Sequence, residues 1–374
     1  MPSRPLHVIY YLTAHGYGHG VRSTGIMNAL RRECPQLHLT IVSALPESFL
    51  RNRLTEFPAN GPTFRNAAFD LGMIQRDSIR VDLPATLQAL QDFVARRPRL
   101  LADETEFLRH ANADMVVTDI PALPLAAAAQ ARLPRLAIGN FSWDWIYDAC
   151  AQSDALDDPW HRVADIFRCD YANANGLLQL PFSPDMSATF SKRIPIPLLA
   201  RPGMSRRLAL AAATGANPEA QWILLSFTTL DWSATALQAV NALPNVEFFT
   251  VRPLQWPGHR HLHAVDRERF SFSDVIATVD TVISKPGYGI LSDCIANRKS
   301  LIYAEREDFA EYPILAQAIP RYLRNVHIPA VDLYAGRLAP SLDALRHAPP
   351  PPEHLPDQGD TIAAQHILHH ASSR

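Results

Sequence analysis

The most informative stretch of the sequence is Thr13-Ala14-His15-Gly16-Tyr17-Gly18-His19-Gly20-Val21-Arg22. It follows an apolar run, residues 6–12, that predicts a buried strand, and it precedes apolar residues at helical spacing from Val21 onward. A glycine-rich turn between a strand and a helix lets the backbone approach a ligand closely, and the helix start offers unpaired N–H groups. The three glycines are evenly spaced, unlike those of the dinucleotide fingerprint, so the pattern does not favour a nicotinamide cofactor.

Length and composition predict a globular protein of two domains. The chain has 374 residues, of which 47% are apolar and 19% are charged. The formal net charge is −2, so no overall positive field favours binding to nucleic acid. Four cysteines lie far apart without a CxxC pair, which argues against a zinc site or a disulfide framework and favours a reducing compartment.

The N-terminus does not have the pattern of a signal peptide, and no apolar run reaches the roughly 20 residues that span a bilayer. We therefore expect a cytoplasmic protein without an integral membrane segment, and peripheral membrane contact stays open.

Strands and helices alternate along both halves of the chain, which predicts two α/β domains with parallel sheets. Buried strands are expected near residues 6–12, 38–43, 115–118, 136–139, 177–180, 222–227, 246–251, 281–284 and 300–304. Prolines at 195, 197 and 202 mark a linker. The expected domains are residues 1–200 and 201–374, and the last helix, about 360–370, is open to packing back on the first domain.

Polar residues follow several of the predicted strands of the first half, at the edge where such sheets bind ligands. His19 and Asp119 are two of them. An imidazole can take a proton from an attacking hydroxyl, and a carboxylate behind it can fix its tautomer. The alternative is that both residues only cap helices, and His15 is a competing base. Residues 141–147 add an aromatic cluster that serves either core packing or carbohydrate stacking.

In the second half, Ser284-Lys285-Pro286-Gly287-Tyr288-Gly289 predicts a strand end, a glycine turn and a helix that begins near Ile290. A helix start of this kind can hold a phosphate through backbone N–H groups. Asp293, expected in the first helical turn, could accept a hydrogen bond from a ribose hydroxyl. The alternative is an ordinary helix N-terminus, and the sequence is not a P-loop.

Two further polar stretches allow more than one interpretation. Residues 305–311 are rich in acidic side chains that either bind sugar hydroxyls or form a solvated charged run. Residues 259–263 carry alternating histidines, for which we favour a solvated loop over a metal site because no carboxylate or cysteine is close in sequence.

Taken together, these motifs resemble GT-B glycosyltransferases. Residues 282–318 are similar to the donor-binding region of MurG-like and UDP-glycosyltransferase enzymes, and the pair His19 and Asp119 falls where plant UDP-glycosyltransferases keep their base and its carboxylate partner. Residues 15–22, 116–119, 140–147 and 285–289 look like the N-terminal, glycosyltransferase-like region of plant L-arabinokinases. The kinase activity of those proteins belongs to a galactokinase-like domain and is not implied here.

The resemblance implies an α/β GT-B fold with two Rossmann-like domains whose parallel sheets face each other across a cleft. The first domain would bind an acceptor and the second a nucleotide sugar, with uridine as the expected base. His19 would deprotonate the acceptor hydroxyl, and Asp119 would orient His19. Direct displacement on an α-linked sugar nucleotide would then invert the anomeric carbon. Hexosyl or N-acetylhexosaminyl transfer is expected, with no cofactor besides the nucleotide-sugar co-substrate and no metal ion.

The same resemblance assigns binding residues. The expected donor-binding residues are Ser284, Lys285, Gly287, Tyr288, Gly289, Asp293, Asp308, Glu311, Phe227 and Thr228. The expected acceptor-binding residues are His15, Gly18, Arg22 and Trp143, with Arg22 contacting the acceptor or a phosphate. Where many such enzymes have a Gly-Gly turn, this chain has residues 226–231 without glycine. A sugar-nucleotide epimerase of the same fold and a non-catalytic sugar-nucleotide-binding module remain alternatives.

Overall fold

The computed structural model describes residues 4–75, 81–153, 155, 158–227, 230, 232–251, 259, 261–306 and 309–372. The chain folds into two compact units. Unit 1 contains Met1–Ile74, Asp82–Leu199 and Gln358–Arg374, and unit 2 contains Gln75–Val81 and Ala200–Asp357. The last segment of the chain therefore belongs with unit 1 and not with the residues that precede it.

Unit 1 is built on a seven-stranded sheet in which neighbouring strands are parallel. The strands are β1 (His7–Leu12), β2 (His38–Val42), β3 (Thr63–Arg65), β4 (Met115–Asp119), β5 (Arg135–Gly139), β6 (Leu177–Gln179) and β7 (Arg193–Pro195). Their order is β3-β2-β1-β4-β5-β6-β7, so the direction of winding reverses between β1 and β4. Every residue of β1 and β4 is buried, as expected where helices cover both faces of a parallel sheet.

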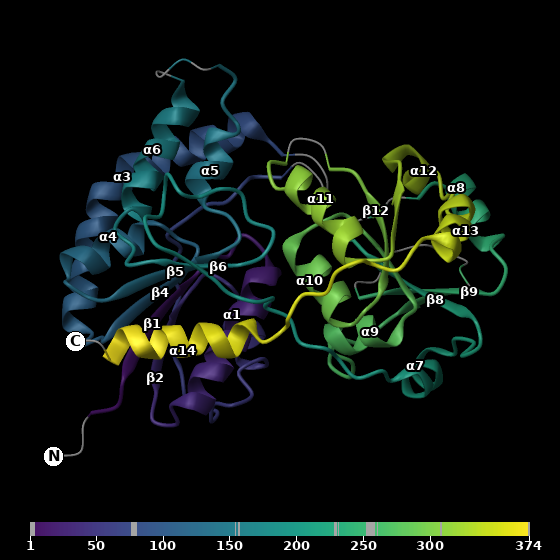
Figure 1. Cartoon of the computed structure of the whole chain (residues 1–374), viewed down its shortest axis with the longest axis horizontal. Coiled ribbons are helices and arrows are strands. Elements are labelled where there is room, and N and C mark those ends of the chain that lie inside the picture. Colours follow the sequence, from purple (N-terminus) through teal and green to yellow (C-terminus); the bar gives the residue numbers. More distant parts are fainter. Residues whose placement is uncertain are drawn as a thin grey trace. The chain divides into compact units, whose positions relative to one another are not determined.

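Helices flank the strands of unit 1 in two groups (Figure 1). They are α1 (Tyr17–Glu33), α2 (Glu47–Arg51), α3 (Leu83–His110), α4 (Leu123–Gln130), α5 (Trp143–Asp148), α6 (Pro159–Tyr171) and α14 (Gly359–Ser372). Helices α3, α4 and α6 pack against one another, whereas α1 packs against α14. The sequence suggests one or two helices over residues 84–110, and α3 is a single helix although Pro98 lies within it.

Unit 2 repeats the same architecture with six parallel strands. They are β8 (Gln221–Ser226), β9 (Val246–Thr250), β10 (Leu262–Ala264), β11 (Thr281–Ser284), β12 (Ser300–Ala304) and β13 (Asn325–Ile328). The order is β10-β9-β8-β11-β12-β13, which again reverses after the first strand of the unit. The helices are α7 (Arg207–Thr214), α8 (Ala234–Asn241), α9 (Phe272–Thr278), α10 (Tyr288–Ala296), α11 (Tyr312–Tyr322), α12 (Ala330–Tyr334) and α13 (Ala339–His347).

Both glycine-rich turns are shorter than the sequence predicts, because the helices behind them begin earlier. Helix α1 begins at Tyr17, so Gly18, His19 and Gly20 lie within its first turns. Gly16 supplies the entry into α1 with φ 157° and ψ 150°, a conformation that residues with a Cβ rarely adopt. Helix α10 begins at Tyr288, so Asp293 lies in the second turn and the prediction of a first-turn position is wrong.

The prediction of a solvated loop at residues 259–263 is wrong at His263. This residue lies in β10, and its side chain is only 9% exposed. Its Nε2 lies 2.7 Å from a carboxylate oxygen of Glu247, and Glu247 belongs to the neighbouring strand β9. The carboxylate is 16 residues away in sequence but is brought close by strand pairing, so the pair stabilises an edge of the sheet.

Candidate functional site

The site in unit 1 forms where β1 and β4 end side by side. Leu12 pairs with Asp119 in the parallel register, and the backbone N–H of Thr13 donates to the carbonyl of Asp119 over 2.9 Å. The chain then turns into α1, which carries His19 and Arg22 one helical turn apart toward the end of β4. Residues separated by 100 positions are thus brought together by topology alone.

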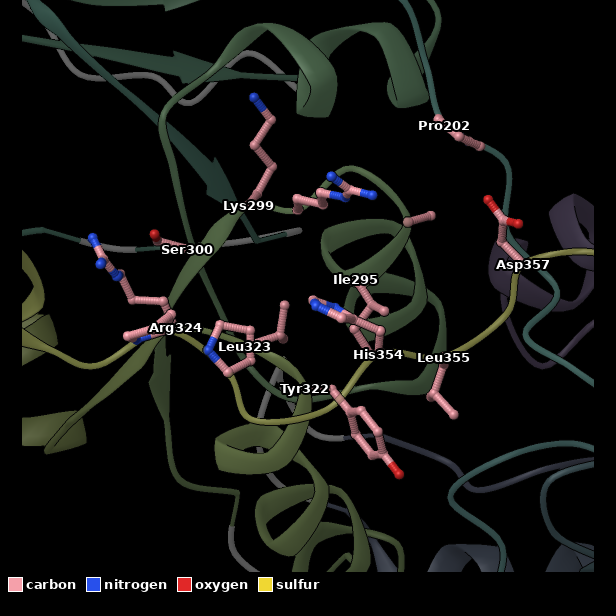
Figure 2. Close-up of a pocket in the computed structure, with 14 residues that line it drawn as sticks. Pro202, Ile295, Lys299, Ser300, Tyr322, Leu323, Arg324, His354, Leu355 and Asp357 are labelled. Atoms are coloured by element: carbon pink, nitrogen blue, oxygen red, sulfur yellow. The ribbon is translucent and has the colours of Figure 1, made fainter.

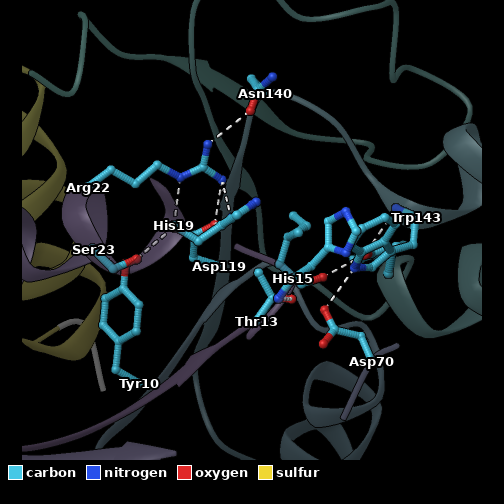
Figure 3. Close-up of polar contacts among 12 residues, drawn as sticks. Tyr10, Thr13, His15, His19, Arg22, Ser23, Asp70, Asp119, Asn140 and Trp143 are labelled. Carbon is cyan, nitrogen blue, oxygen red and sulfur yellow. Dashed lines mark hydrogen bonds and ion pairs between the residues drawn. The ribbon is translucent and has the colours of Figure 1, made fainter. Parts of the chain in front are cut away.

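Asp119 is the centre of the polar contacts drawn in Figure 3. His19 Nδ1 lies 2.9 Å from its Oδ1, while Nε of Arg22 and the hydroxyl of Ser23 donate to its Oδ2 over 2.8 and 2.6 Å. Arg22 Nη2 also donates to Oδ1, and Nη1 donates to Oδ1 of Asn140 over 2.9 Å. Both carboxylate oxygens of Asp119 are therefore hydrogen-bonded.

The charges of this cluster set the ionisation of both of its acid–base groups. Burial alone would raise the pKa of the Asp119 carboxyl, but the nearby charge of Arg22 and the hydrogen bonds hold this pKa well below its usual range. Burial and the charge of Arg22 lower the pKa of His19 from 6.5, although Asp119 acts in the opposite direction. His19 is therefore a neutral imidazole at pH 7, with its Nδ1 facing Asp119.

Arg22 lies in a buried polar cluster, although the sequence predicts contact with an acceptor or a phosphate. Its side chain is only 5% exposed, and its donors are directed to Asp119 and Asn140. Nη2 also lies 3.0 Å from Nδ1 of His19. The guanidinium thus belongs to the same buried cluster as the carboxylate and the imidazole, and its contact with an acceptor or a phosphate stays a prediction.

His15 and Trp143 form a second group with Asp70, shown on the other side of Figure 3. The indole N–H of Trp143 donates to Oδ2 of Asp70 over 2.8 Å, and the ring of His15 stands edge-on to the indole with centroids 5.0 Å apart. The backbone N–H of Met73 donates to Nδ1 of His15 over 3.3 Å, which leaves Nε2 of a neutral His15 as a donor. The aromatic ring of Trp143 is 1% exposed, so it packs in the core.

Sequence reasoning misses Asp70, because it comes from a stretch without periodicity. Burial raises the pKa of the Asp70 carboxyl to about 6, although hydrogen bonds from Thr13 and Trp143 favour its charged form. The neighbouring Gly72 has φ 67°, and a Cβ there would lie 2.0 Å from Nδ1 of His15. A glycine is therefore required for the loop to close on His15. In the sequence, Gly72 is the one residue near Asp70 that indicates this close contact.

In unit 2, the residues predicted to bind a donor gather around the start of α10. Gly287 is the N-cap with φ −160° and ψ 152°. Among the described residues, no side chain caps the helix, and a Cβ on Gly287 would meet no atom within 4 Å. Gly289 lies within the helix, Tyr288 is buried, and Lys285 and Asp293 are half-buried. As far as the described residues show, the space in front of the first N–H groups of α10 is thus open to an anion.

Other predicted donor residues are placed differently. The hydroxyl of Ser284 donates to the carbonyl of Ser226 over 3.0 Å and so bridges two strands. Phe227 is 7% exposed and belongs to the hydrophobic core of unit 2, so its side chain packs against that core. Glu311 is a buried residue at the N-cap of α11. Thr228 and Asp308 lie outside the described residues.

Arg306 is a further residue that the sequence does not single out, because it lies within a charged run. Its guanidinium lies 3.5 Å from the centre of the Phe309 ring, and burial lowers the pKa of Arg306 to about 10 while Glu311 acts in the opposite direction. Its Nε has no hydrogen-bond partner among the described residues. The end of β12 therefore carries a desolvated cation beside a carboxylate.

The two doubly wound units define the GT-B fold, which confirms the fold class expected from the sequence. A UDP-glucosyltransferase from Polygonum tinctorium superposes with a TM-score of 0.64 at 13% identity over 100% of both chains. UGT89C1 of Arabidopsis thaliana, solved with UDP, gives 0.60 at 12% identity over 98% of this chain and 100% of that one. A UDP-N-acetylglucosamine 2-epimerase gives 0.55 at 13% identity over 99% of this chain and 98% of that one.

The sequence itself is 26% identical to L-arabinokinase of Arabidopsis thaliana over 91% of this chain, which confirms the resemblance to that protein. The match covers 32% of the relative, so the chain spans about a third of its length. No model of a known protein family matches the chain. Among the described residues, no helix is long and apolar enough to cross a membrane.

Proposed function

We propose that the chain is a glycosyltransferase that moves a sugar from a nucleotide-diphosphate sugar to an acceptor hydroxyl. The observation that carries this proposal is the contact of 2.9 Å between Nδ1 of His19 and Oδ1 of Asp119 at the carboxyl edge of the unit 1 sheet. A proton on Nδ1 that is donated to Asp119 leaves the lone pair of Nε2 for the acceptor hydroxyl. His19 is then the general base, and Asp119 orients it.

The state of His19 in the structure supports this role. The lowered pKa of His19 keeps the imidazole neutral near pH 7, as a general base requires. Removal of the acceptor proton generates an oxygen nucleophile that attacks the anomeric carbon while the bond to the nucleoside diphosphate breaks. The proton ends on His19, and the electron pair of the broken bond leaves with the diphosphate. A single displacement of this kind inverts the anomeric carbon.

Unit 2 supplies the donor-binding residues in this proposal. The open N-terminus of α10 offers backbone N–H groups to the diphosphate and stabilises the charge that develops on it. Asp293 binds the ribose, and Glu311 binds hydroxyls of the donor sugar, which is a hexose or an N-acetylhexosamine. A relative of the same fold, UGT89C1, was solved with UDP, which supports uridine as the base. No metal ion is required because the helix start carries the diphosphate.

The test is a panel of nucleotide sugars followed by a turnover assay. A UDP-sugar at 100 times its dissociation constant should stabilise the protein by about 2.7 kcal/mol in thermal unfolding. Release of UDP should then fall by about 100-fold in His19→Ala, the usual scale for the loss of a general base. His263→Ala is the matched control, since it removes another buried histidine that is paired with a carboxylate. Unchanged UDP release in His19→Ala would end the assignment.

A second candidate is a sugar-nucleotide epimerase, because a UDP-N-acetylglucosamine 2-epimerase shares the fold with a TM-score of 0.55. Such an enzyme acts on the sugar nucleotide without an acceptor. Incubation with UDP-N-acetylglucosamine alone should then yield an isomerised sugar nucleotide, whereas a transferase leaves the sugar configuration intact or slowly hydrolyses the donor. Binding without either reaction would instead indicate a sugar-nucleotide-binding module.

A further inference from the structure

Unit 2 contains a cavity of about 680 Å³ at the edge of its sheet that lies away from the start of α10 (Figure 2). Its walls come from the turn between α10 and β12, the turn between α11 and β13, and the segment 350–357. Turns that lead from a helix into a parallel strand lie at the amino ends of the strands. Residues 285–289 of the proposed donor site follow the carboxyl end of β11, so the cavity is separate from that site.

The lining of the cavity carries an excess of positive charge. Arg298, Lys299 and Arg324 contribute three cations, and Asp357 contributes one carboxylate. In the view of Figure 2, Lys299 and Arg324 stand on one side and Asp357 on the other. The whole chain has a formal net charge of −2, so this excess is local.

These cations differ from several arginines of unit 2 in the hydrogen bonds and ion pairs of their side chains. Within the described ranges, none of the side chains of Arg298, Lys299 and Arg324 forms a hydrogen bond or an ion pair. Arg207, Arg321 and Arg337, by contrast, are paired with carboxylates at 3.2, 2.9 and 2.5 Å. Cations that line a cavity without forming ion pairs indicate a site for an anion.

Burial in the wall of the cavity affects the ammonium group of Lys299. It is half-buried, and burial lowers the pKa of its ammonium, although Asp280 acts in the opposite direction. The carboxylate of Asp280 is itself held by Arg207 and by the backbone N–H of Trp222, at 3.2 and 2.8 Å. An anion in the cavity would therefore supply the neutralisation that Asp280 gives only in part.

Stabilisation of a helix C-terminus by a nearby cation does not explain the positions of Arg298, Lys299 and Arg324. Cations stabilise a helix C-terminus within its last turn, but the last turn of α10 contains no basic residue. Arg298 and Lys299 lie beyond the end of α10, and Arg324 lies beyond the end of α11. The basic residue in the last turn of α11 is Arg321, which pairs with Glu353 instead of facing the cavity as a free cation.

The remaining walls of the cavity suit an organic group. Apolar and aromatic side chains share the lining with the cations: Ile295, Tyr322, Leu323, Pro350, Pro351 and Leu355. The segment that brings the two prolines and Leu355 is fixed to the end of α11. Arg321 donates two hydrogen bonds of 2.9 Å to Glu353, and the backbone N–H of Glu353 donates to the carbonyl of Arg321 over 3.0 Å. The cavity is thus formed before a ligand enters.

We propose that this cavity binds a phosphorylated small molecule as a second ligand site of unit 2. The phosphate lies among Arg298, Lys299 and Arg324, and the organic part lies against Tyr322 and Leu355. The volume of about 680 Å³ falls in the range of about 300–1,000 Å³ that is usual for small-molecule sites. The inference does not rest on the glycosyltransferase activity, because no residue of that proposal lines the cavity.

The test is calorimetric titration with inorganic phosphate, pyrophosphate and glucose 1-phosphate, with glucose as the uncharged probe, at constant ionic strength. The unaltered protein should bind at least one phosphorylated probe and not glucose. The double variant Arg298→Asn and Arg324→Gln should weaken that binding at least tenfold. Asn is used at position 298 because Arg298 has φ 53°, a conformation that Asn tolerates. The control is Arg337→Gln, which removes a cation of the same unit outside the cavity.

The outcomes separate this site from the donor site. Gly287→Ala, which alters the start of α10, should leave the binding of the phosphorylated probe unchanged, because Gly287 does not line the cavity. Binding that the double variant retains in full, that Gly287→Ala weakens as much as the double variant does, or that no phosphorylated probe shows, would overturn the proposal. Thermal unfolding of the double variant checks that it folds, and either single variant replaces it in the assay if it does not.

Discussion

Arg22 holds both carboxylate oxygens of Asp119, the same carboxylate that contacts His19. A histidine with an isolated carboxylate behind it gains basicity from that charge. Here the positive charge of the guanidinium offsets it, and Nη2 of Arg22 lies 3.0 Å from the imidazole Nδ1. The cluster therefore orients His19 through Asp119, while burial and the charge of Arg22 keep the pKa of the imidazole below its ordinary value of 6.5.

Removal of the charge of Arg22 should raise the pKa of His19. In Arg22→Gln, the carboxylate of Asp119 acts on the imidazole without a nearby cation, so the acid limb of the pH–rate profile should move to higher pH. Arg22→Lys keeps the charge and should leave the limb near its original position, although it loses the two-pronged contact. The imidazole resonance of His19, identified by its absence in His19→Gln, gives the pKa by NMR. An equal pKa in the Gln and Lys variants would contradict this account.

Asp119→Asn should strongly destabilise unit 1. The substitution removes the carboxylate charge that faces the guanidinium of Arg22, a side chain that is only 5% exposed. Breaking a buried pair in this way typically costs about 3–5 kcal/mol. Urea unfolding of both proteins measures the difference.

Asp170→Asn is the matched control, because Asp170 also holds an arginine through two contacts, but that arginine, Arg97, is 24% exposed. Water can solvate Arg97 after the substitution, so the loss of stability should be smaller than for Asp119→Asn. Equal losses in the two variants would mean that burial of Arg22 does not set the cost.

The sequence predicts the central strands of both units well, because a strand buried on both faces is a continuous apolar run. Strands β1, β4 and β11 lie within a residue of their predicted bounds. The starts of α1 and α10 are missed because glycines are taken as turn residues. Gly20 lies within α1, and its lack of a side chain lets the helix pack closely on Phe49 of α2, since a Cβ would lie 2.6 Å from that ring.

The contacts of the site depend on distances that the sequence does not contain. Alternation predicts a parallel sheet whose strands end at one edge, and so it places His19 and Asp119 at that edge. Their direct contact follows from the adjacency of β1 and β4, which alternation does not predict. The pairing of Arg22 with Asp119, and of Trp143 with Asp70, depends on side-chain directions that only packing determines. His263 and Glu247 show the same limit, because a short polar strand at a sheet edge has no apolar run to mark it.

Asp70 should make the stability of the protein depend on pH in the direction opposite to that of an ion-paired carboxylate. Burial raises its pKa to about 6, whereas an unfolded chain has a value near 3.8, so the folded state binds this proton more tightly. The free energy of unfolding should therefore rise as the pH falls from about 6 toward 4. The rise relative to Asp70→Asn should be about 2 kcal/mol between pH 7 and pH 4, from 1.36 kcal/mol per pKa unit.

Urea unfolding of both proteins between pH 4 and pH 7 measures this difference, because the Asn variant keeps the shape of the side chain without its titration. Asp185→Asn serves as a contrast, since hydrogen bonds from Ser187 and the nearby Arg193 lower the pKa of Asp185 and the sign should reverse. A difference between the unaltered protein and Asp70→Asn that stays constant over this pH range would show that Asp70 titrates normally.

Gly287→Ala should remove nucleotide binding without disturbing the fold. The backbone at Gly287 has φ −160°, which any residue adopts, and the added methyl group would meet no atom of the described part of the chain within 4 Å. The methyl group would instead occupy the open space in front of the first N–H groups of α10, where we place the diphosphate. The affinity for UDP in calorimetry should fall at least tenfold, while the midpoint of thermal unfolding changes little.

Two other glycines provide the controls for that experiment. Gly203→Ala places a Cβ 2.2 Å from the carbonyl oxygen of Ser273, so it should destabilise unit 2, which shows what a steric effect on the fold looks like. Gly25→Ala lies in α1, where the nearest atom to the added Cβ is 3.9 Å away, and should leave both stability and UDP affinity close to their original values. If Gly287→Ala binds UDP as tightly as Gly25→Ala does, the nucleotide does not sit at the start of α10, and the proposed donor site must be abandoned.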